Sequence, residues 1–130
     1  EATAGKMTAV RREALTHQTL PGNGPGRHSN SNFVLSEFEL TAISIRNPAL
    51  RQVVKFARAI DDYSQTGYGV SKAIDGTTAN SNGWAVDGPT RNAPATAIFI
   101  AAAPFLFTAL VWSIQSLHSC IVNSISCMSE

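Results

Sequence analysis

The sequence is poor in charge and in cysteine. Aspartate, glutamate, lysine and arginine supply 15% of its 130 residues, whereas soluble domains usually reach about 25%. The net charge is +1 and no basic run occurs, so nucleic acid is not predicted as a partner. No apolar run typical of a signal peptide follows the first residues, and the first residue is not methionine. We therefore expect a single domain taken from a longer protein.

Cysteine occurs only at Cys120 and Cys127. The pair could form one disulfide or remain as two thiols. No C-x-x-C motif or neighbouring histidine pair accompanies them, so they are not predicted metal ligands. A haem-attachment C-x-x-C-H motif is also missing, and the sequence predicts no cofactor.

Recognisable catalytic motifs are missing as well. No G-x-S-x-G motif is present, the three histidines lie far apart, and no dinucleotide-binding glycine motif precedes a helix. Asp61 and Asp62 could be combined with Glu37 and Glu39 into a glycosidase-like carboxylate pair. Carboxylates that alternate along a solvated strand are far commoner, and the sequence predicts no enzyme.

The apolar pattern that is present favours strands. Residues 33–41 alternate most clearly, with Val34, Phe38 and Leu40 on the predicted core face. Residues 7–15 fit a strand or a short helix, because Arg11 and Arg12 interrupt the alternation. Further strands are predicted at 52–57, 96–101 and 105–112, with Pro104 in the connection between the last two.

Turn-forming residues separate these segments. The Gly- and Pro-rich stretch 20–27 predicts an irregular surface loop, and 61–69 predicts a loop with Tyr63 and Tyr68 packing beneath it. Strands joined by such turns indicate an all-β sandwich.

Residues 73–86 are the central stretch of the sequence. Its first part is predicted as a strand end that runs into a tight turn. Asp75 can accept a hydrogen bond from a backbone N–H two residues on, and Gly76 accepts a positive φ. Asp75 could instead help to hold calcium, although the loop offers a single carboxylate. Trp84 is interpreted as a core residue, with a sugar-stacking face as the alternative.

Several motifs together resemble a known family. They are V-R-R-E-A-L at 10–15, P-G-N-G-P-G-R at 21–27, S-N-F-V-L-S-E-F-E-L-T-A at 31–42, D-Y-S-Q-T-G-Y at 62–68, A-I-D-G at 73–76 and G-W-A-V at 83–86. The series is similar to a galactose-binding-like, or discoidin-like, module of large planctomycete-type secreted proteins that also carry cytochrome-c-like domains.

This resemblance implies a jelly-roll β-sandwich whose loops bind ligands, often sugars. Candidate ligand-binding residues are Asp75, Asn82 and Trp84; no catalytic or metal-binding residue is implied. We expect a non-catalytic recognition module, secreted or periplasmic within a larger protein, with carbohydrate and neighbouring domains as its partners. The alternatives are a structural spacer between catalytic or cytochrome domains, and a membrane-anchored fragment, because residues 93–114 contain an uncharged run.

The end of the chain departs from the family pattern, which usually continues with H-x-I-G-R-F-R-L. We expect a sandwich over residues 1–112 and a divergent tail at 113–130. The apolar spacing in this tail suits one face of a helix, so the tail is predicted as disordered or as a short helix. A shifted reading frame would explain such a tail.

Overall fold

The computed structural model describes residues 5–44, 46–79, 81–107, 109–118 and 122–128, and they are mostly strand. The strands are β1 (Gly5–Ala14), β2 (Val34–Ile43), β3 (Arg51–Val53), β4 (Phe56–Asp61), β5 (Trp84–Ala85), β6 (Ala95–Phe107), β7 (Ala109–His118) and β8 (Val122–Met128). Two short 3-10 helices, η1 (Pro21–Asn23) and η2 (Val70–Ala73), complete the described elements.

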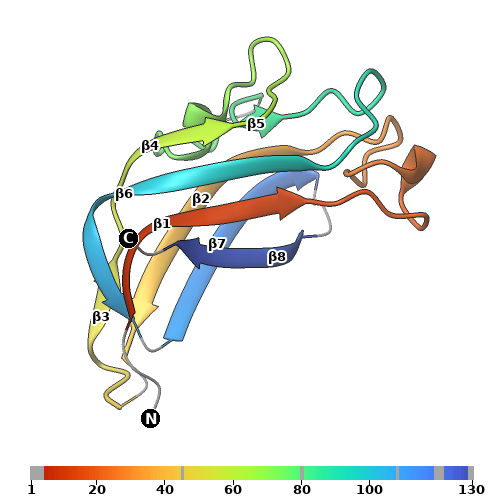
Figure 1. The fold of residues 1–130 in the computed structure, drawn as a ribbon. Coiled ribbons are helices and arrows are strands. Elements are labelled where there is room, and N and C mark those ends of the chain that lie inside the picture. The colour runs from red at the N-terminus through yellow and green to blue at the C-terminus, as the bar shows by residue number, and fades with distance from the viewer. Residues whose placement is uncertain (1–4, 45, 80, 108, 119–121, 129–130) are drawn as a thin grey trace.

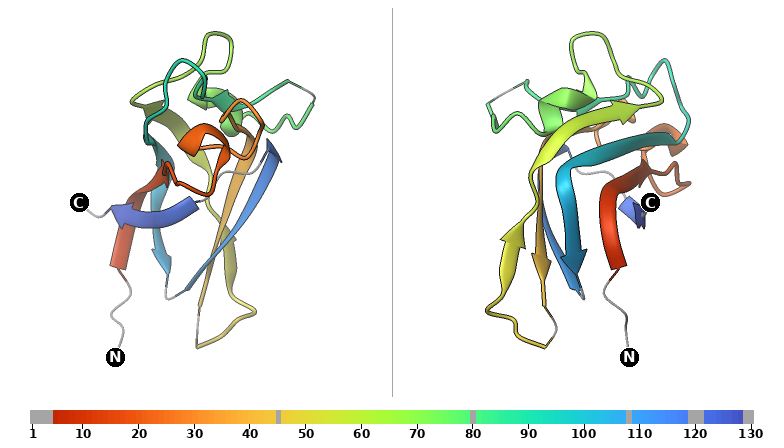
Figure 2. Two further views of the ribbon diagram at one scale, coloured as in Figure 1. Left: turned by 90° about the vertical axis from the view of Figure 1, so that its right-hand side faces the viewer. Right: turned by 60° about the vertical axis from the view of Figure 1, so that its left-hand side comes forward.

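The strands form two antiparallel sheets (Figures 1 and 2). One has the order β4-β6-β1-β8. The other is built on β2, which pairs with β7 along its length and with β3 and β5 at its two ends. Because β7 occupies one edge of β2, β3 and β5 must share the opposite edge. The fold is all-β and compatible with the predicted sandwich.

The core lies between the sheets and is rich in aromatic residues. Phe38 of β2 lies 4.7 Å from Phe99 of β6 and 5.4 Å from Phe56, ring centroid to centroid. The guanidinium carbon of Arg12 lies 5.1 Å from the Phe38 centroid, in cation–π geometry. Arg12 is only 3% exposed, so this charged residue, which interrupts the β1 pattern, lies at the core.

The prediction for β2 is right for one face and incomplete for the other. Phe38 and Leu40 are buried, as expected, whereas Val34 on the same face is only half-buried. Phe33 and Leu35, which strand alternation places on the opposite face, are also buried. The pairing of β2 with β7 is irregular on both sides of Leu35, and this breaks the regular alternation at the start of the strand.

Pro104 lies inside β6 and not in the predicted connection. The β1–β6 register jumps from Met7↔Phe105 to Ala9↔Ile100, so the residues around Pro104 form a bulge opposite β1. A bulge leaves a residue without a ladder partner, and proline lacks the N–H that a ladder would need. The two strands predicted on either side of Pro104 therefore become one bent strand and its neighbour β7 (Figure 1).

Three local predictions need correction. The predicted strand at 52–57 is divided into β3 and β4, because Val54 and Lys55 connect the two sheets. The stretch 20–27 is not wholly at the surface: Gly26 is buried, and a Cβ there would clash with the carbonyl oxygen of Asn32. Residues before Asp75 form η2, a 3-10 turn, and not a strand end.

The tail prediction is wrong for the described residues. Residues 113–118 belong to β7, and Val122–Met128 forms β8, which pairs with β1. The apolar spacing suited a helix, but pairing with the exposed edges of β1 and β2 determines the conformation. Cys120 lies outside the described residues, so the state of the cysteine pair stays open.

The membrane-anchored alternative depended on an uncharged run at 93–114. Among the described residues, no helix is long and apolar enough to cross a membrane. Most of that run lies in β6 and β7.

Deletion of residues 109–130 tests the new assignment of the tail. It removes β7 and β8 and leaves one edge of β2 and one edge of β1 unpaired, so we expect the protein to lose cooperative thermal unfolding and to aggregate. Circular dichroism melting and size-exclusion chromatography provide the measurement. A truncated protein that melts cooperatively at the wild-type temperature would contradict the assignment.

Candidate functional site at the Asp75 turn

The Asp75 turn is held by its own side chains. The Thr77 N–H donates to Asp75 Oδ1 at 2.9 Å, and Gly76 has a φ of 77°. Asn82 Nδ2 lies 3.1 Å from each Asp75 carboxylate oxygen and 2.9 Å from the Thr77 carbonyl oxygen. The predicted turn is confirmed, and it brings the candidate residues Asp75 and Asn82 together.

Trp84, the third candidate, lies in the core. It is 2% exposed, its ring meets Phe33 edge-on at 5.3 Å between centroids, and its Nε1 donates to the Tyr63 carbonyl oxygen at 3.0 Å. The core interpretation is confirmed. A ligand-binding role for Trp84 is wrong for this structure, because its ring is not available to stack on a sugar.

A pocket of about 280 Å³ adjoins the turn. It opens where the edge of β2 is left uncovered between β3, which pairs at 41–43, and β5, which pairs at 34–35. Its lining combines carboxylates, one lysine and apolar groups: Glu37, Phe38, Glu39, Val53, Val54, Lys55, Phe56, Ile74, Asp75 and Gly76. The walls of this pocket come from three separate segments of the chain, so no local sequence pattern predicts it.

Glu37 has the most perturbed environment in the pocket. It is 8% exposed, and its Oε2 accepts the Gly76 N–H at 3.1 Å. Burial raises the pKa of Glu37 above its ordinary value of 4.5, and the nearby Asp75 and Glu39 charges raise it further, while the Gly76 hydrogen bond opposes them. Glu37 was predicted on a solvated face, and its burial corrects that prediction.

The pocket offers hydrogen-bond acceptors beside an apolar wall. Glu39 and Asp75 are exposed, while Phe56 is half-buried. Lys55 is the one cation among the lining residues. In the described part of the chain, no group of three His, Cys, Asp or Glu side chains is arranged to hold a metal ion. The arrangement suits an uncharged polar ligand with one less polar face.

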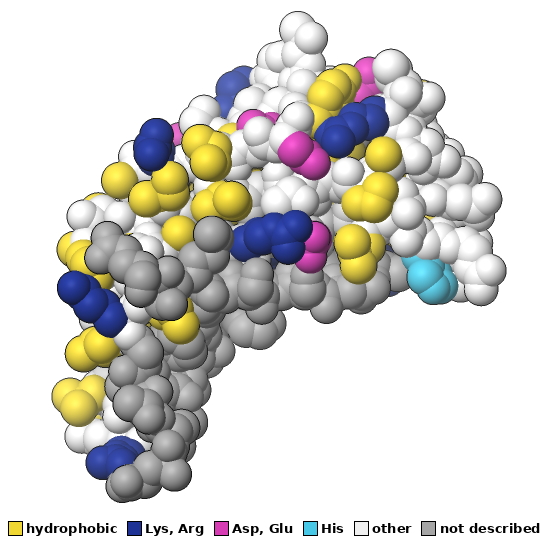
Figure 3. Space-filling model, in the orientation of Figure 1, with side chains coloured by type: hydrophobic (Ala, Val, Ile, Leu, Met, Phe, Trp, Pro, Cys, Tyr) yellow, Lys and Arg dark blue, Asp and Glu magenta, His cyan; other side chains and the backbone are white. Residues whose placement is uncertain are grey.

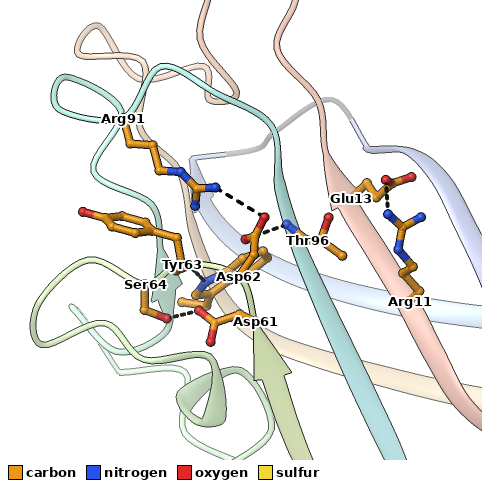
Figure 4. Close-up of polar contacts among 9 residues, drawn as sticks. Arg11, Glu13, Asp61, Asp62, Tyr63, Ser64, Arg91 and Thr96 are labelled. Atoms are coloured by element: carbon orange, nitrogen blue, oxygen red, sulfur yellow. Dashed lines mark hydrogen bonds and ion pairs between the residues drawn. The ribbon is translucent and has the colours of Figure 1, made fainter.

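A second polar cluster lies at the end of β4 (Figure 4). Asp62 Oδ2 lies 3.4 Å from Arg91 Nη2, and Asp62 Oδ1 accepts the Thr96 N–H at 3.0 Å. The Arg91 guanidinium lies 4.7 Å from the Tyr63 centroid. The sequence does not predict a role for Arg91. This residue lies in the loop after β5, and its contact with Asp62 depends on that loop meeting β4 in the folded chain.

The suggested carboxylate pair does not form a site. Asp61 and Asp62 line a depression of about 240 Å³ with Ile60, Thr96 and Ile98. Glu37 and Glu39 line the pocket at the Asp75 turn, so the two groups of carboxylates belong to different surfaces.

No protein-family model, curated protein or solved structure matches the chain. The resemblance to galactose-binding-like modules therefore stays a prediction.

Asp75→Ala tests the role of the turn. The variant loses the acceptor for the Thr77 N–H and for Asn82, so we expect the free energy of unfolding to fall by about 1 kcal/mol. Chemical denaturation measures this change, and Thr78→Ala in the same exposed loop is the control. Unchanged stability, together with calcium binding that only the wild type shows, would mean that Asp75 is a ligand and not a turn residue.

Glu37→Gln tests the raised pKa of Glu37. Because the folded-state pKa lies above the unfolded-state value, the folded protein binds this proton more tightly, and stability is lost as pH rises through the folded-state pKa. Glutamine keeps an oxygen for the Gly76 N–H but does not titrate. We expect the variant to be more stable than wild type near pH 7 and the difference to shrink towards about pH 4.

Urea denaturation of both proteins across this pH range measures the effect. A difference in stability that is constant with pH would show that Glu37 has an unshifted pKa.

Proposed function

We propose that this chain is a non-catalytic recognition module that binds carbohydrate in the pocket at the Asp75 turn. The observation that carries the proposal is the lining of that pocket. Three carboxylates and one ammonium group stand beside the apolar side chains of Val53, Phe56 and Ile74.

Sugar chemistry fits such a lining. Ionised carboxylates accept hydrogen bonds from hydroxyl groups, and these charge-assisted bonds are stronger than bonds between neutral groups. Lys55 can donate to a hydroxyl or ring oxygen, and the apolar wall can contact the C–H face of a sugar ring. The volume of about 280 Å³ lies just below the range of about 300–1,000 Å³ for drug-sized ligands, which favours a single sugar ring.

The proposal includes a galactose-binding-like jelly roll within a secreted multidomain protein. The motif series at residues 10–86 supports this family, and the two antiparallel sheets are compatible with it. Fold analogy alone does not identify a ligand, so the carbohydrate assignment depends on the pocket.

Titration with monosaccharides tests the proposal. We expect galactose, glucose, mannose or N-acetylglucosamine to bind the wild type with a dissociation constant of about 1 mM, as suits a small open pocket. Isothermal titration calorimetry and NMR shift changes at the pocket residues provide the measurement. Glu39→Gln should weaken binding by about tenfold, because the amide is a weaker acceptor than the carboxylate.

Asp61→Asn is the matched control, because it makes the same kind of change at the other depression. Equal effects of Glu39→Gln and Asp61→Asn would place sugar binding elsewhere. No binding of any of these sugars at about 100 mM would overturn the proposal.

A further inference from the structure

Within the described ranges, the outer edge of β4 is an unpaired strand edge. There β4 ends its sheet and pairs only with β6. The Asp62 N–H donates to the Thr96 carbonyl oxygen at 3.1 Å, towards β6. Strand alternation then directs the backbone groups of Ile60 towards β6 and those of Ala59 and Asp61 outward. Among the described residues, none forms a backbone hydrogen bond with Ala59 or Asp61 on the outer side.

The charge pattern of this strand is complementary to that of a second, antiparallel copy of the same strand. Arg58, Ile60 and Asp62 alternate along one face, with a cation and an anion on either side of an apolar residue. Ile60 is 45% exposed, and Arg58 is exposed. Two such strands that run antiparallel about a twofold axis at Ile60 place Arg58 of each copy opposite Asp62 of the other.

We propose that two copies of this chain associate through their β4 edges, antiparallel and in this register. Ala59 of one copy exchanges backbone hydrogen bonds with Asp61 of the second copy. Ile60 meets Ile60 of the second copy, and two Arg58–Asp62 pairs flank this contact. The β4-β6-β1-β8 sheets of the two copies join into one continuous sheet across the dimer.

The surroundings of the edge favour a second copy as the partner. The depression lined by Ile60, Asp61, Asp62, Thr96 and Ile98 lies over the paired strands β4 and β6, beside this edge. Figure 3 shows apolar side chains dispersed among charged ones over the β4–β6 face. Asp62 is held in place by Arg91 and the Thr96 N–H, so its charge is positioned before association.

The dimer should be weak and reversible. One pair of six-residue strands buries less than the roughly 1,000 Å² of a stable interface, which suggests a dissociation constant in the range of about 10 μM to 1 mM. The backbone groups of an unpaired edge can pair with a strand of any sequence. The charge pattern of Arg58 and Asp62 favours a second copy of this chain over other strands.

Sedimentation velocity of the full chain over a concentration series tests the dimer. We expect the wild type to shift from monomer to dimer, and Arg58→Asp and Ile60→Lys to weaken association by at least about tenfold, because they place like charges opposite each other. Arg27→Asp is the control: it makes the same charge change in an exposed loop and should leave association unchanged. Circular dichroism verifies that each variant is folded.

Two further measurements test the register. Amide hydrogen exchange at Ala59 and Asp61 should slow as the concentration of wild type rises and should not do so in Arg58→Asp. An equimolar mixture of Arg58→Asp and Asp62→Arg should associate more tightly than either variant alone, because the opposite-charge pairs are restored between unlike copies.

A wild-type chain that remains monomeric at about 1 mM would overturn the proposal. So would a dimer that Arg58→Asp and Ile60→Lys leave intact, or one in which exchange at Ala59 and Asp61 does not change with concentration.

Discussion

The contact of Phe38 with the opposite sheet is the interaction on which the rest of the structure depends. Phe38 comes from β2, Phe99 and Phe56 come from β6 and β4, and Arg12 approaches the Phe38 ring from β1. One side chain therefore joins strands of both sheets. Strand alternation then turns the neighbours of Phe38, Glu37 and Glu39, away from the aromatic cluster, so the same insertion that holds the sheets together also places two carboxylates at the pocket.

The pocket exists because β2 is only partly covered along one edge. β3 and β5 are short and pair only near the two ends of β2, and the Asp75 turn lies over the gap between them. The turn is stiffened by Asn82, which contacts both oxygens of Asp75. A preformed wall of this kind lowers the entropic cost of binding a small ligand. The same geometry holds Glu37 where its ionised form is disfavoured, which is a common property of functional sites.

Local chemistry could be predicted from the sequence where neighbouring residues determine it. The Asp75–Gly76 turn, the burial of Trp84 and the strand at β2 depend on short-range preferences, and all three were predicted. Features that depend on a distant partner were not. Pro104 fits within β6 only because β6 bulges there opposite β1, the tail becomes strand only because β1 and β2 offer edges, and Arg91 reaches Asp62 across 29 positions. The pocket belongs to this second group, since its three walls meet only in the folded chain.

The neighbourhood of β1 and β8 has a mechanical consequence. The two strands are antiparallel partners, with Ala9 opposite Met128 and Ala14 opposite Val122, so the beginning of β1 and the end of β8 lie at the same end of the sheet. Tension that pulls these two points apart would act across the strands and break the β1–β8 hydrogen bonds one after another. It would not load all of them at once, as a force along the strands would. The chain would yield to a small pulling force at this seam while the aromatic cluster around Phe38 stayed intact.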